Sequence, residues 1–171
     1  DYDVVIVADY GHGLITPKIV EVLEKESKFL AVNTQLNASN WEYHTISKYQ
    51  NVDYICVHEG ELRHNYHNRT DTVENLVMDL FGRTKAEIIT ITRGKEGALT
   101  YRNNKFLNSP AFTGEVIDRV GAGDALLAMT SISLVAGIEE DLAMFFGNLA
   151  ASQKISYVGN KYSVNKIILL K

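Results

Sequence analysis

Four short runs of apolar and β-branched residues recur along the chain, and segments of helical or polar character separate them. The runs span residues 4–8, 29–32, 54–57 and 88–91. A strand that is apolar at nearly every position must be covered on both faces, as in a parallel sheet that lies between helices. The sequence therefore predicts a three-layer α/β fold with a mainly parallel sheet.

The segments between the runs carry helix signals. Residues 17–26 follow a threonine and begin with a proline, and their apolar positions recur at helical spacing. Asp71 and Glu74 have the spacing of a capping box ahead of a second amphipathic stripe, which we expect to end at Gly82. Both segments are predicted to be helices.

The second half of the chain adds a hairpin and two longer helices. An Asn-Asn pair between two alternating segments predicts a β-hairpin near residues 98–108. Helices are expected at about 122–136 and 139–157. Neither a linker nor an internal repeat divides the sequence, so we expect a single domain over residues 1–171.

The composition excludes several classes of protein. The 171 residues are 46% hydrophobic and carry a formal net charge of −4, so no basic excess is present to bind a nucleic-acid backbone. The longest nearly uncharged stretch, 125–138, is shorter than the roughly 18 to 20 apolar residues that span a bilayer. The single cysteine, Cys56, lies in an apolar run, which indicates core packing and an intracellular, cytoplasmic protein. The chain begins at Asp1, and we expect a fragment of a longer protein.

Polar residues and glycines follow each of the four apolar runs. Ligands of open α/β sheets bind outside the carboxyl ends of the strands, so these residues are candidates for a site. They are Asp9, Gly11 and Gly13, then Asn33 and Gln35, then His58 and Glu61, and finally Thr92, Gly94 and Gly97. Surface loops are commonly polar and glycine-rich, which is the alternative at any one position. Because six of the twelve glycines form three close pairs, we favour backbone approach to a ligand.

The most specific motif is D-R-V-G-A-G-D at residues 118–124, directly ahead of an apolar helix. Its glycines allow the N–H groups of Gly121, Ala122 and Gly123 to turn toward one point at the positive end of the helix dipole. Such an anion hole suits a transferring phosphoryl group. Asp124 lies in the first turn of the helix, where an ionised carboxylate can accept a proton from an alcohol. The alternative is an acidic helix start after a glycine turn.

Other nucleotide and metal motifs are absent from the sequence. No G-x-x-x-x-G-K-[ST] segment occurs, which excludes a Walker-type loop. Leu126 occupies the position of the third glycine in the dinucleotide fingerprint, so a Rossmann dehydrogenase is not expected. The segment H-E-G-E-L places Leu62 where a zinc motif needs its second histidine.

Taken together, these motifs resemble the C-terminal half of a PfkB-type, ribokinase-like carbohydrate kinase over essentially the whole chain. Residues 118–124 are similar to that family's D-T-x-G-A-G-D signature, 92–97 to its T-x-G-x-x-G nucleotide loop, and 58–61 to its N-x-x-E motif. Residues 7–13, V-A-D-Y-G-H-G, are most similar to the heptose phosphate kinase branch, whose members are often fused to a nucleotidyltransferase. The resemblance implies a ribokinase-like, Rossmann-like three-layer fold whose N-terminal half and lid are absent from this chain.

The resemblance also implies cofactors, partners and a role for each matched residue. Asp124 would be the base for the hydroxyl of a sugar or sugar phosphate, while ATP and Mg²⁺ would be the cofactors. Glu61 and His58 would hold Mg²⁺ through its water molecules. The remaining assignments are Gly121, Ala122 and Gly123 for the anion hole, Thr92, Gly94, Gly97, Asn148, Val158 and Gly159 for the nucleotide, and Asp9, Gly11 and Asn33 for the substrate. A fusion partner and a homodimer are compatible with this branch, whereas nucleic acid and membrane are not expected.

Several positions depart from the family pattern. His58 replaces an expected asparagine, Arg119 a threonine and His12 a lysine, and Asn33 and Gln35 stand where the branch tends to carry aspartate and lysine. Two hypotheses therefore stay open. The intact glycine motif favours an ATP-dependent sugar kinase, whereas the lost lysine and His58 favour a degenerate domain that binds nucleotide or sugar nucleotide without catalysis. Either the ring of His58 faces the site, where a protonated imidazole would strengthen the binding of phosphate, or the ring caps the strand end and faces away from the site.

Overall fold

The computed structural model of the chain describes residues 2–38, 40, 44–112, 117–159 and 162–165. In these ranges six strands form one sheet in the order β1-β2-β3-β4-β5-β6. The parallel strands are β1 (Val5–Asp9), β2 (Leu30–Thr34), β3 (Tyr54–His58) and β4 (Ile88–Thr92), and the antiparallel ones are β5 (Ala98–Arg102) and β6 (Lys105–Ser109). All four predicted parallel strands are confirmed, each within two residues of its expected ends.

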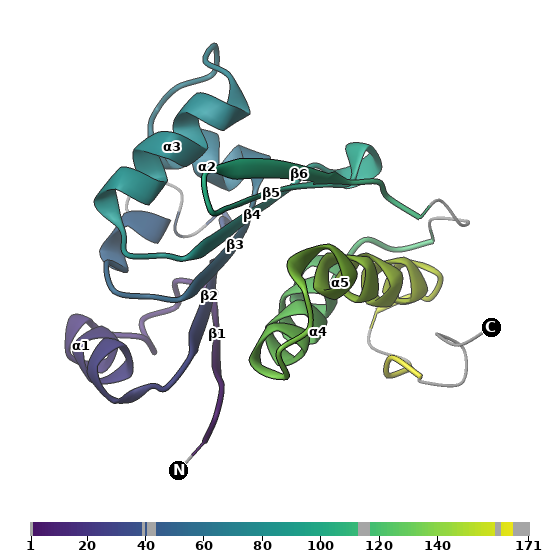
Figure 1. Cartoon of the computed structure of the whole chain (residues 1–171), viewed down its shortest axis with the longest axis horizontal. Helices are drawn as coiled ribbons and strands as arrows, with labels where there is room; N and C mark the ends of the chain where they lie inside the picture. Colours follow the sequence, from purple (N-terminus) through teal and green to yellow (C-terminus); the bar gives the residue numbers. More distant parts are fainter. Residues whose placement is uncertain (1, 39, 41–43, 113–116, 160–161, 166–171) are drawn as a thin grey trace.

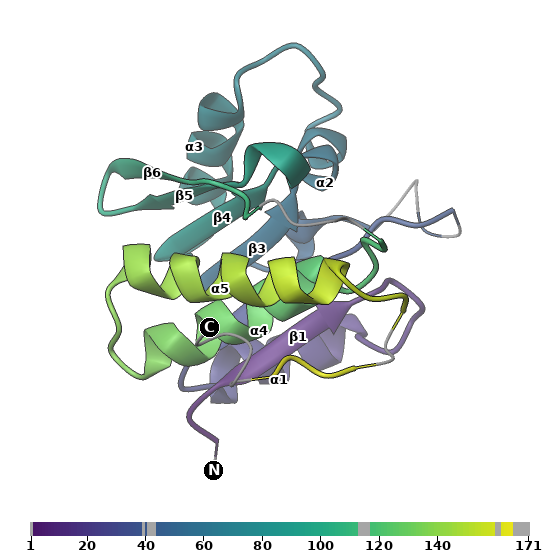
Figure 2. The same ribbon diagram turned by 90° about the vertical axis from the view of Figure 1, so that its right-hand side faces the viewer.

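Helices cover both faces of the sheet, which confirms the three-layer architecture (Figures 1 and 2). One face carries α1 (Pro17–Glu26), α2 (Glu59–Asn65) and α3 (Val73–Arg83), and the other carries α4 (Ala122–Val135) and α5 (Glu140–Ile155). Two short 3₁₀ helices, η1 (Ile46–Lys48) and η2 (Gly94–Glu96), lie in loops. None of the helices in the described ranges is long and apolar enough to cross a membrane.

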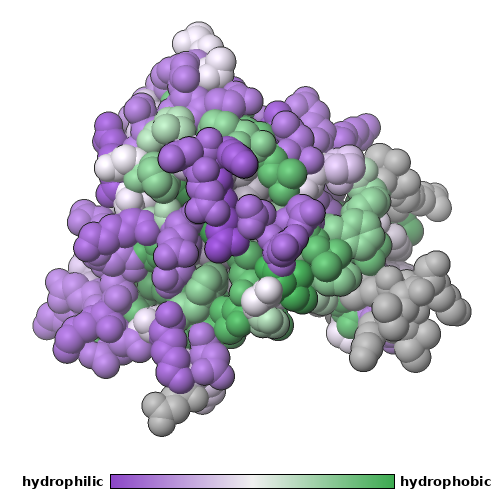
Figure 3. Space-filling model, viewed as in Figure 1, coloured by the Kyte–Doolittle hydropathy of each residue, from purple (hydrophilic) through white to green (hydrophobic). Residues whose placement is uncertain are grey.

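Alternate residues of the strands feed two separate cores, because successive side chains of a strand point to opposite faces. In β3, Ile55 and Val57 pack with the α1–α3 side, whereas Tyr54 and Cys56 pack with Leu126 and other residues of the α4–α5 side. Figure 3 shows hydrophilic residues over much of the α1–α3 side and hydrophobic residues at the surface near α4 and α5. Both layers are needed to bury the central strands, as their apolar sequences predict.

The helix starts follow local sequence, with one correction. At α1, Thr16 accepts a hydrogen bond from the N–H of Ile19, as predicted. At α3 the expected capping box at Asp71 is wrong, because Thr72 is the N-cap and its hydroxyl accepts from the N–H of Asn75 at 3.2 Å. The expected end at Gly82 is also wrong by one residue. This glycine does not adopt the left-handed conformation that terminates many helices, and α3 continues through it.

The hairpin and the last two helices agree with the sequence. Asn103 and Asn104 have φ values of 50° and 61°, the left-handed pair that a two-residue β-hairpin turn requires. The helices α4 and α5 pack closely on each other, since a Cβ atom at Gly147 would collide with the hydroxyl of Thr130. This packing holds α5 beside the start of α4, where the site lies.

Candidate functional site

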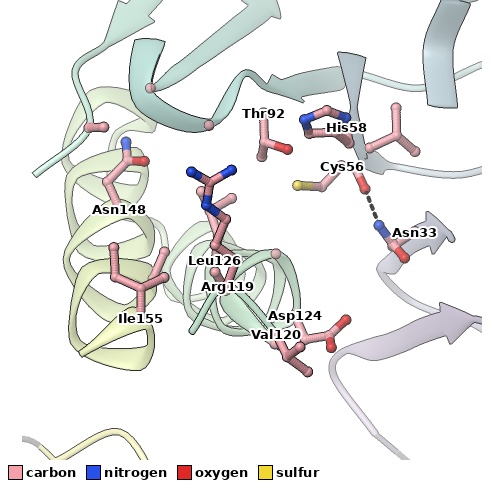
Figure 4. Close-up of a pocket in the computed structure, with 18 of the residues that line it drawn as sticks. Asn33, Cys56, His58, Thr92, Arg119, Val120, Asp124, Leu126, Asn148 and Ile155 are labelled. Carbon is pink, nitrogen blue, oxygen red and sulfur yellow. Dashed lines mark hydrogen bonds between the residues drawn. The ribbon is translucent and has the colours of Figure 1, made fainter. Parts of the chain in front are cut away.

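A cavity of about 660 Å³ lies at the carboxyl ends of β2, β3 and β4, beside the start of α4 (Figure 4). The parallel register brings these strand ends to one edge of the sheet, and His58 pairs directly with Thr92. Most of the site residues expected from sequence line this cavity, namely Asn33, His58, Glu61, Thr92, Gly94, Gly97, Gly121, Ala122, Gly123, Asp124 and Asn148. These residues therefore meet at the carboxyl ends of the strands, and what they bind stays a prediction.

Asp9 does not line the cavity, although we expected it to contact substrate. Its carboxylate is 3% exposed and accepts hydrogen bonds from the hydroxyl of Tyr49 at 2.7 Å and the N–H of Gly11 at 3.0 Å. Lys48 forms an ion pair with it. Burial raises the pKa of Asp9, but the bonds from Lys48, Tyr49 and Gly11 outweigh burial and leave the pKa lowered. Asp9 therefore holds the loop after β1 in place from inside.

Gly11 is also packed inside this loop rather than open to the cavity. It has a φ of 68°, and a Cβ atom there would lie 2.5 Å from Nδ2 of Asn40 and 2.7 Å from Cγ of His44. The side chains of Asn40 and His44 therefore fill the space that a ligand would need beside Gly11. The glycine is explained by the close approach of these two side chains and not by the approach of a ligand to the backbone.

The first aspartate of the motif ties two loops together. Asp118 accepts hydrogen bonds from the N–H of Val120 at 3.0 Å and from that of Gly159 at 2.7 Å. These bonds lower the pKa of Asp118. Lys154 donates to the carbonyl of Gly159 at 2.6 Å. Val158 and Gly159, expected near the nucleotide, are thus fixed against the turn before α4 but do not line the cavity.

The glycine turn at the start of α4 has the predicted form with one difference. Gly121 is the N-cap with a φ of 80°, and the N–H of Ala122 donates to the carbonyl of Arg119 at 3.3 Å. The N–H of Ala122 therefore already has an acceptor, contrary to the expected three-donor anion hole. The first N–H groups inside a helix lack intrahelical acceptors, so Gly123 and Asp124 offer donors, and the N–H of Gly121 also has no acceptor within the described ranges. A Cβ atom at Gly123 would meet nothing within 4 Å, which leaves this turn open.

Asp124 has a partner that the sequence did not indicate. The phenol of Tyr10, in the loop after β1, donates a hydrogen bond to Oδ2 of Asp124 at 2.8 Å. This hydrogen bond raises the pKa of Tyr10, so the phenol stays a donor. Tyr10 stands between Asp9 and Gly11, which we had assigned to the substrate. The loop reaches the site through this tyrosine instead of through its neighbours.

Glu61 and His58 form the start of α2. The carboxylate of Glu61 accepts from the N–H of His58 at 2.6 Å and from that of Leu36 at 3.2 Å. Nδ1 of His58 accepts from the N–H of Gly60 at 3.0 Å, which requires this nitrogen to be unprotonated. His58 thus caps the helix while its exposed side chain lines the cavity, so each of the two expected orientations is half correct.

Two carboxylates, Glu61 and Asp124, line the same cavity. Burial raises the pKa of Glu61, the charge of Asp124 adds to this rise, and the backbone hydrogen bonds oppose it. Within the described ranges no cluster of three or more His, Cys, Asp or Glu side chains could hold a metal ion. Mg²⁺ commonly keeps several waters and takes one or two carboxylates together with substrate phosphates. The residues present therefore fit a magnesium ion that arrives with a nucleotide, and they do not fit a zinc cage.

The opposite wall of the cavity comes from η2 and α5. Gly97 ends η2 with a φ of 85°, and the loop around it presents Thr92 and Gly94 to the cavity. Asn148 of α5 is 6% exposed, and its Nδ2 has no hydrogen-bond partner in the described part of the chain. Figure 4 shows this amide at the edge of the cavity. Buried amide donors are normally satisfied, so the position suits a polar ligand.

Cys56 contributes a thiol to the cavity floor. It is 2% exposed, and burial raises its pKa to about 12. The charges of Glu61 and Asp124 add to this rise. The thiol therefore remains protonated, as expected for a core residue rather than a nucleophile.

Comparisons with known proteins agree with this geometry. A model described as pfkB family carbohydrate kinase matches residues 16–167. The bifunctional protein HldE of Bradyrhizobium diazoefficiens is 28% identical over 165 residues, which cover 92% of this chain and 32% of that protein. The chain thus spans about a third of the length of such curated relatives.

Solved structures show the same fold. Ribokinase from Thermotoga maritima matches with a TM-score of 0.79 at 17% identity, covering 98% of this chain and 55% of that one. Ribokinase from Arabidopsis thaliana, solved with ribose and ATP, matches with a TM-score of 0.76 at 16% identity, again over 98% and 55%. The expected ribokinase-like fold is confirmed.

Proposed function

Because the chain belongs to the pfkB family of carbohydrate kinases, we propose that it is the nucleotide-binding part of an enzyme that phosphorylates a sugar or sugar phosphate with ATP. One observation carries this proposal. A single cavity holds the open glycine turn at the start of α4 and, in the first turn of the same helix, the carboxylate of Asp124. Hydrogen-bond donors for phosphate and an acceptor for a proton thus lie side by side, as phosphoryl transfer to an alcohol requires.

In this proposal Asp124 is the base. Tyr10 holds Oδ2 of Asp124, which leaves Oδ1 to accept the proton of the substrate hydroxyl. As the hydroxyl oxygen forms its bond to the γ-phosphorus, the bond from that phosphorus to the bridging oxygen breaks and ADP leaves. The N–H groups at the start of α4 offset the negative charge of the moving group. Mg²⁺, when bound with ATP, would supply further charge neutralisation, and Glu61 would hold it through water.

The other wall of the cavity is the proposed nucleotide side. Thr92, Gly94 and Gly97 bring a loop toward the phosphates, and the unpartnered amide of Asn148 offers a donor to the nucleoside. Asp118 fixes the backbone of Gly159 at the start of α4. Val158 and Gly159 are therefore proposed to border the nucleotide rather than to enclose it.

The substrate class and the partners are further parts of the proposal. The similarity of residues 7–13 to the heptose phosphate kinase branch favours a phosphorylated heptose. Asn33 lines the cavity and donates to the carbonyl of Cys56 at 3.0 Å, so it is the proposed substrate-side residue, while Asp9 and Gly11 shape the loop that carries Tyr10. HldE relatives are named bifunctional, which supports a fusion to a nucleotidyltransferase domain. Association as a homodimer and a cytoplasmic location are further parts of this proposal.

A domain that binds nucleotide without catalysis is the alternative, and its support from sequence is the lost lysine, where His12 stands, together with the replacement of asparagine by His58. Nδ1 of His58 accepts the N–H of Gly60, which is the capping contact that an asparagine oxygen would make. The replacement therefore keeps the start of α2 and the position of Glu61. This favours the kinase over the degenerate domain.

Calorimetric titration of the chain with ATP and Mg²⁺ tests the proposal through Gly123→Asp. The added carboxylate would lie at the open turn and repel phosphate, so we expect affinity to fall at least roughly tenfold. Gly82→Asp is the matched control. Gly82 also lies in a helix and has open space for a Cβ atom, but it lies outside the cavity, so its affinity should equal that of wild type. Equal affinity in both variants would exclude the start of α4 as the phosphate site.

A further inference from the structure

The side chain of Arg119 occupies a notable place in the cavity. It lies in the turn before α4, is exposed, and lines the cavity. Figure 4 shows its guanidinium projecting into the space between Asn148 and Thr92. Within the described ranges its side chain forms no ion pair or hydrogen bond. A guanidinium with five donors is therefore available to a ligand.

No carboxylate near Arg119 pairs with its guanidinium within the described ranges. Two carboxylates, Glu61 and Asp124, and two permanent cations, Lys95 and Arg119, line the cavity. The carboxylates already accept hydrogen bonds from other groups, Glu61 from two backbone N–H groups and Asp124 from Tyr10. Asp118, the acidic neighbour in sequence, is likewise held by backbone N–H groups. None of these carboxylates neutralises the guanidinium.

The position of the Arg119 guanidinium indicates which part of the proposed nucleotide it contacts. The amide of Asn148 marks the nucleoside side, and the turn at Gly123 and Asp124 marks the end where the phosphoryl group moves. In Figure 4 the guanidinium of Arg119 lies between the labelled side chains of Asn148 and Asp124. A planar guanidinium matches two phosphate oxygens at once, which a threonine hydroxyl cannot do.

We propose that Arg119 binds the phosphate chain of the nucleotide through its guanidinium, and thereby sets the preference of this chain for nucleoside di- and triphosphates over nucleosides. This inference rests on the proposed function. The arginine at this position is then a gain of a phosphate contact rather than a sign of a degenerate site. Lys95, a point charge on the exposed η2 loop, would add attraction without fixing geometry.

The test is calorimetric titration of the chain with adenosine, ADP and ATP in the presence of Mg²⁺. Arg119→Gln keeps an unbranched polar side chain but shortens it and removes the charge and the planar guanidinium. Because a hydrogen bond to a charged group is strong, we expect ADP and ATP to bind roughly tenfold or more weakly while adenosine binds equally well. The affinity of Arg119→Lys for ADP and ATP should lie between that of wild type and that of Arg119→Gln. The melting temperature should not change, since the substitution keeps the backbone and the side chain of Arg119 forms no ion pair or hydrogen bond within the described ranges.

Arg69→Gln is the matched control, because Arg69 is an exposed arginine between α2 and α3 that does not line the cavity. It should bind all three compounds like wild type. Unchanged ADP affinity in Arg119→Gln, or an equal loss for adenosine and ADP, would overturn the phosphate assignment, the latter in favour of contact with the base. A wild-type chain that binds none of the three compounds would overturn the proposed function itself and this inference with it.

Discussion

Replacing Gly97 by alanine should destabilise this protein more than adding a methyl group at any other position of the loop at residues 92–97. Gly97 has φ and ψ values of 85° and −133°, a region that is essentially restricted to glycine. Its carbonyl accepts from the N–H of Arg93 at 2.8 Å and its N–H donates to Gly94 at 3.1 Å, so the loop cannot relax freely. An added Cβ atom would also press on backbone after β6, at 2.7 Å from the nitrogen of Ala111.

Two terms set the magnitude. A non-glycine residue in this conformation costs about 1 to 3 kcal/mol. The collision adds about 1 to 3 kcal/mol, because the contacted atoms are backbone that cannot rotate away. The sum for Gly97→Ala is roughly 2 to 6 kcal/mol, a large fraction of the roughly 5 to 15 kcal/mol by which domains are stable.

Gly94→Ala is the control that separates the two terms. Gly94 also has a positive φ, 60°, but a Cβ atom there meets nothing within 4 Å. It should lose only about 1 to 2 kcal/mol, the cost of a left-handed residue. Urea unfolding at pH 7 gives both free energies. Equal losses for the two variants would refute the argument that backbone crowding fixes the loop.

Three further predictions follow from single contacts. His58→Ala should lose about 1 kcal/mol of unfolding free energy with the helix cap, whereas His58→Asn should lose almost none, and equal losses in urea would disprove the capping role. Gly147→Ala should lose about 1 to 3 kcal/mol because its Cβ atom collides with Thr130, while Gly82→Ala in α3 should gain a few tenths, and the reverse order in thermal melts would contradict the packing. Since the pKa of Asp9 is lowered from 3.8, its charge stabilises the fold above about pH 4 and this is lost as pH falls further; the deficit of Asp9→Asn should therefore shrink between pH 5 and pH 3, and a deficit that does not change with pH would count against the buried carboxylate.

Most of the fold could be predicted because the information is local. Each parallel strand is a run of apolar residues, and the Asn103-Asn104 pair consists of a residue type that readily adopts the left-handed conformation of a hairpin turn. The start of α3 was missed because Asp71 and Thr72 are adjacent residues that both suit an N-cap. Asp71 instead accepts from the N–H of Thr72 at 2.8 Å, a choice that depends on backbone geometry rather than on residue type.

The site was predictable where one segment carries it, and less so where distant segments meet. The glycine turn and Asp124 are contiguous, so their spacing indicated a phosphate site. Tyr10 lies 114 residues before Asp124, and no local pattern links them. Asp9 follows a strand and was therefore expected to face a ligand. Its carboxylate instead contacts Lys48 and Tyr49, which lie about 40 residues later in the sequence. Side chains at a strand end can turn toward a ligand or toward the protein, and only the fold decides which.

Asp124→Asn tests the central claim most directly, in the protein that carries this chain. Phosphoryl transfer from ATP to the sugar and binding of ATP are measured side by side. Asparagine keeps the shape of the side chain and an oxygen for the Tyr10 hydroxyl, but it cannot accept the proton of the substrate. We predict a loss in turnover of about 10² to 10⁴-fold, typical of a general base, with ATP affinity within a few-fold of wild type. Turnover near the wild-type value would contradict the account.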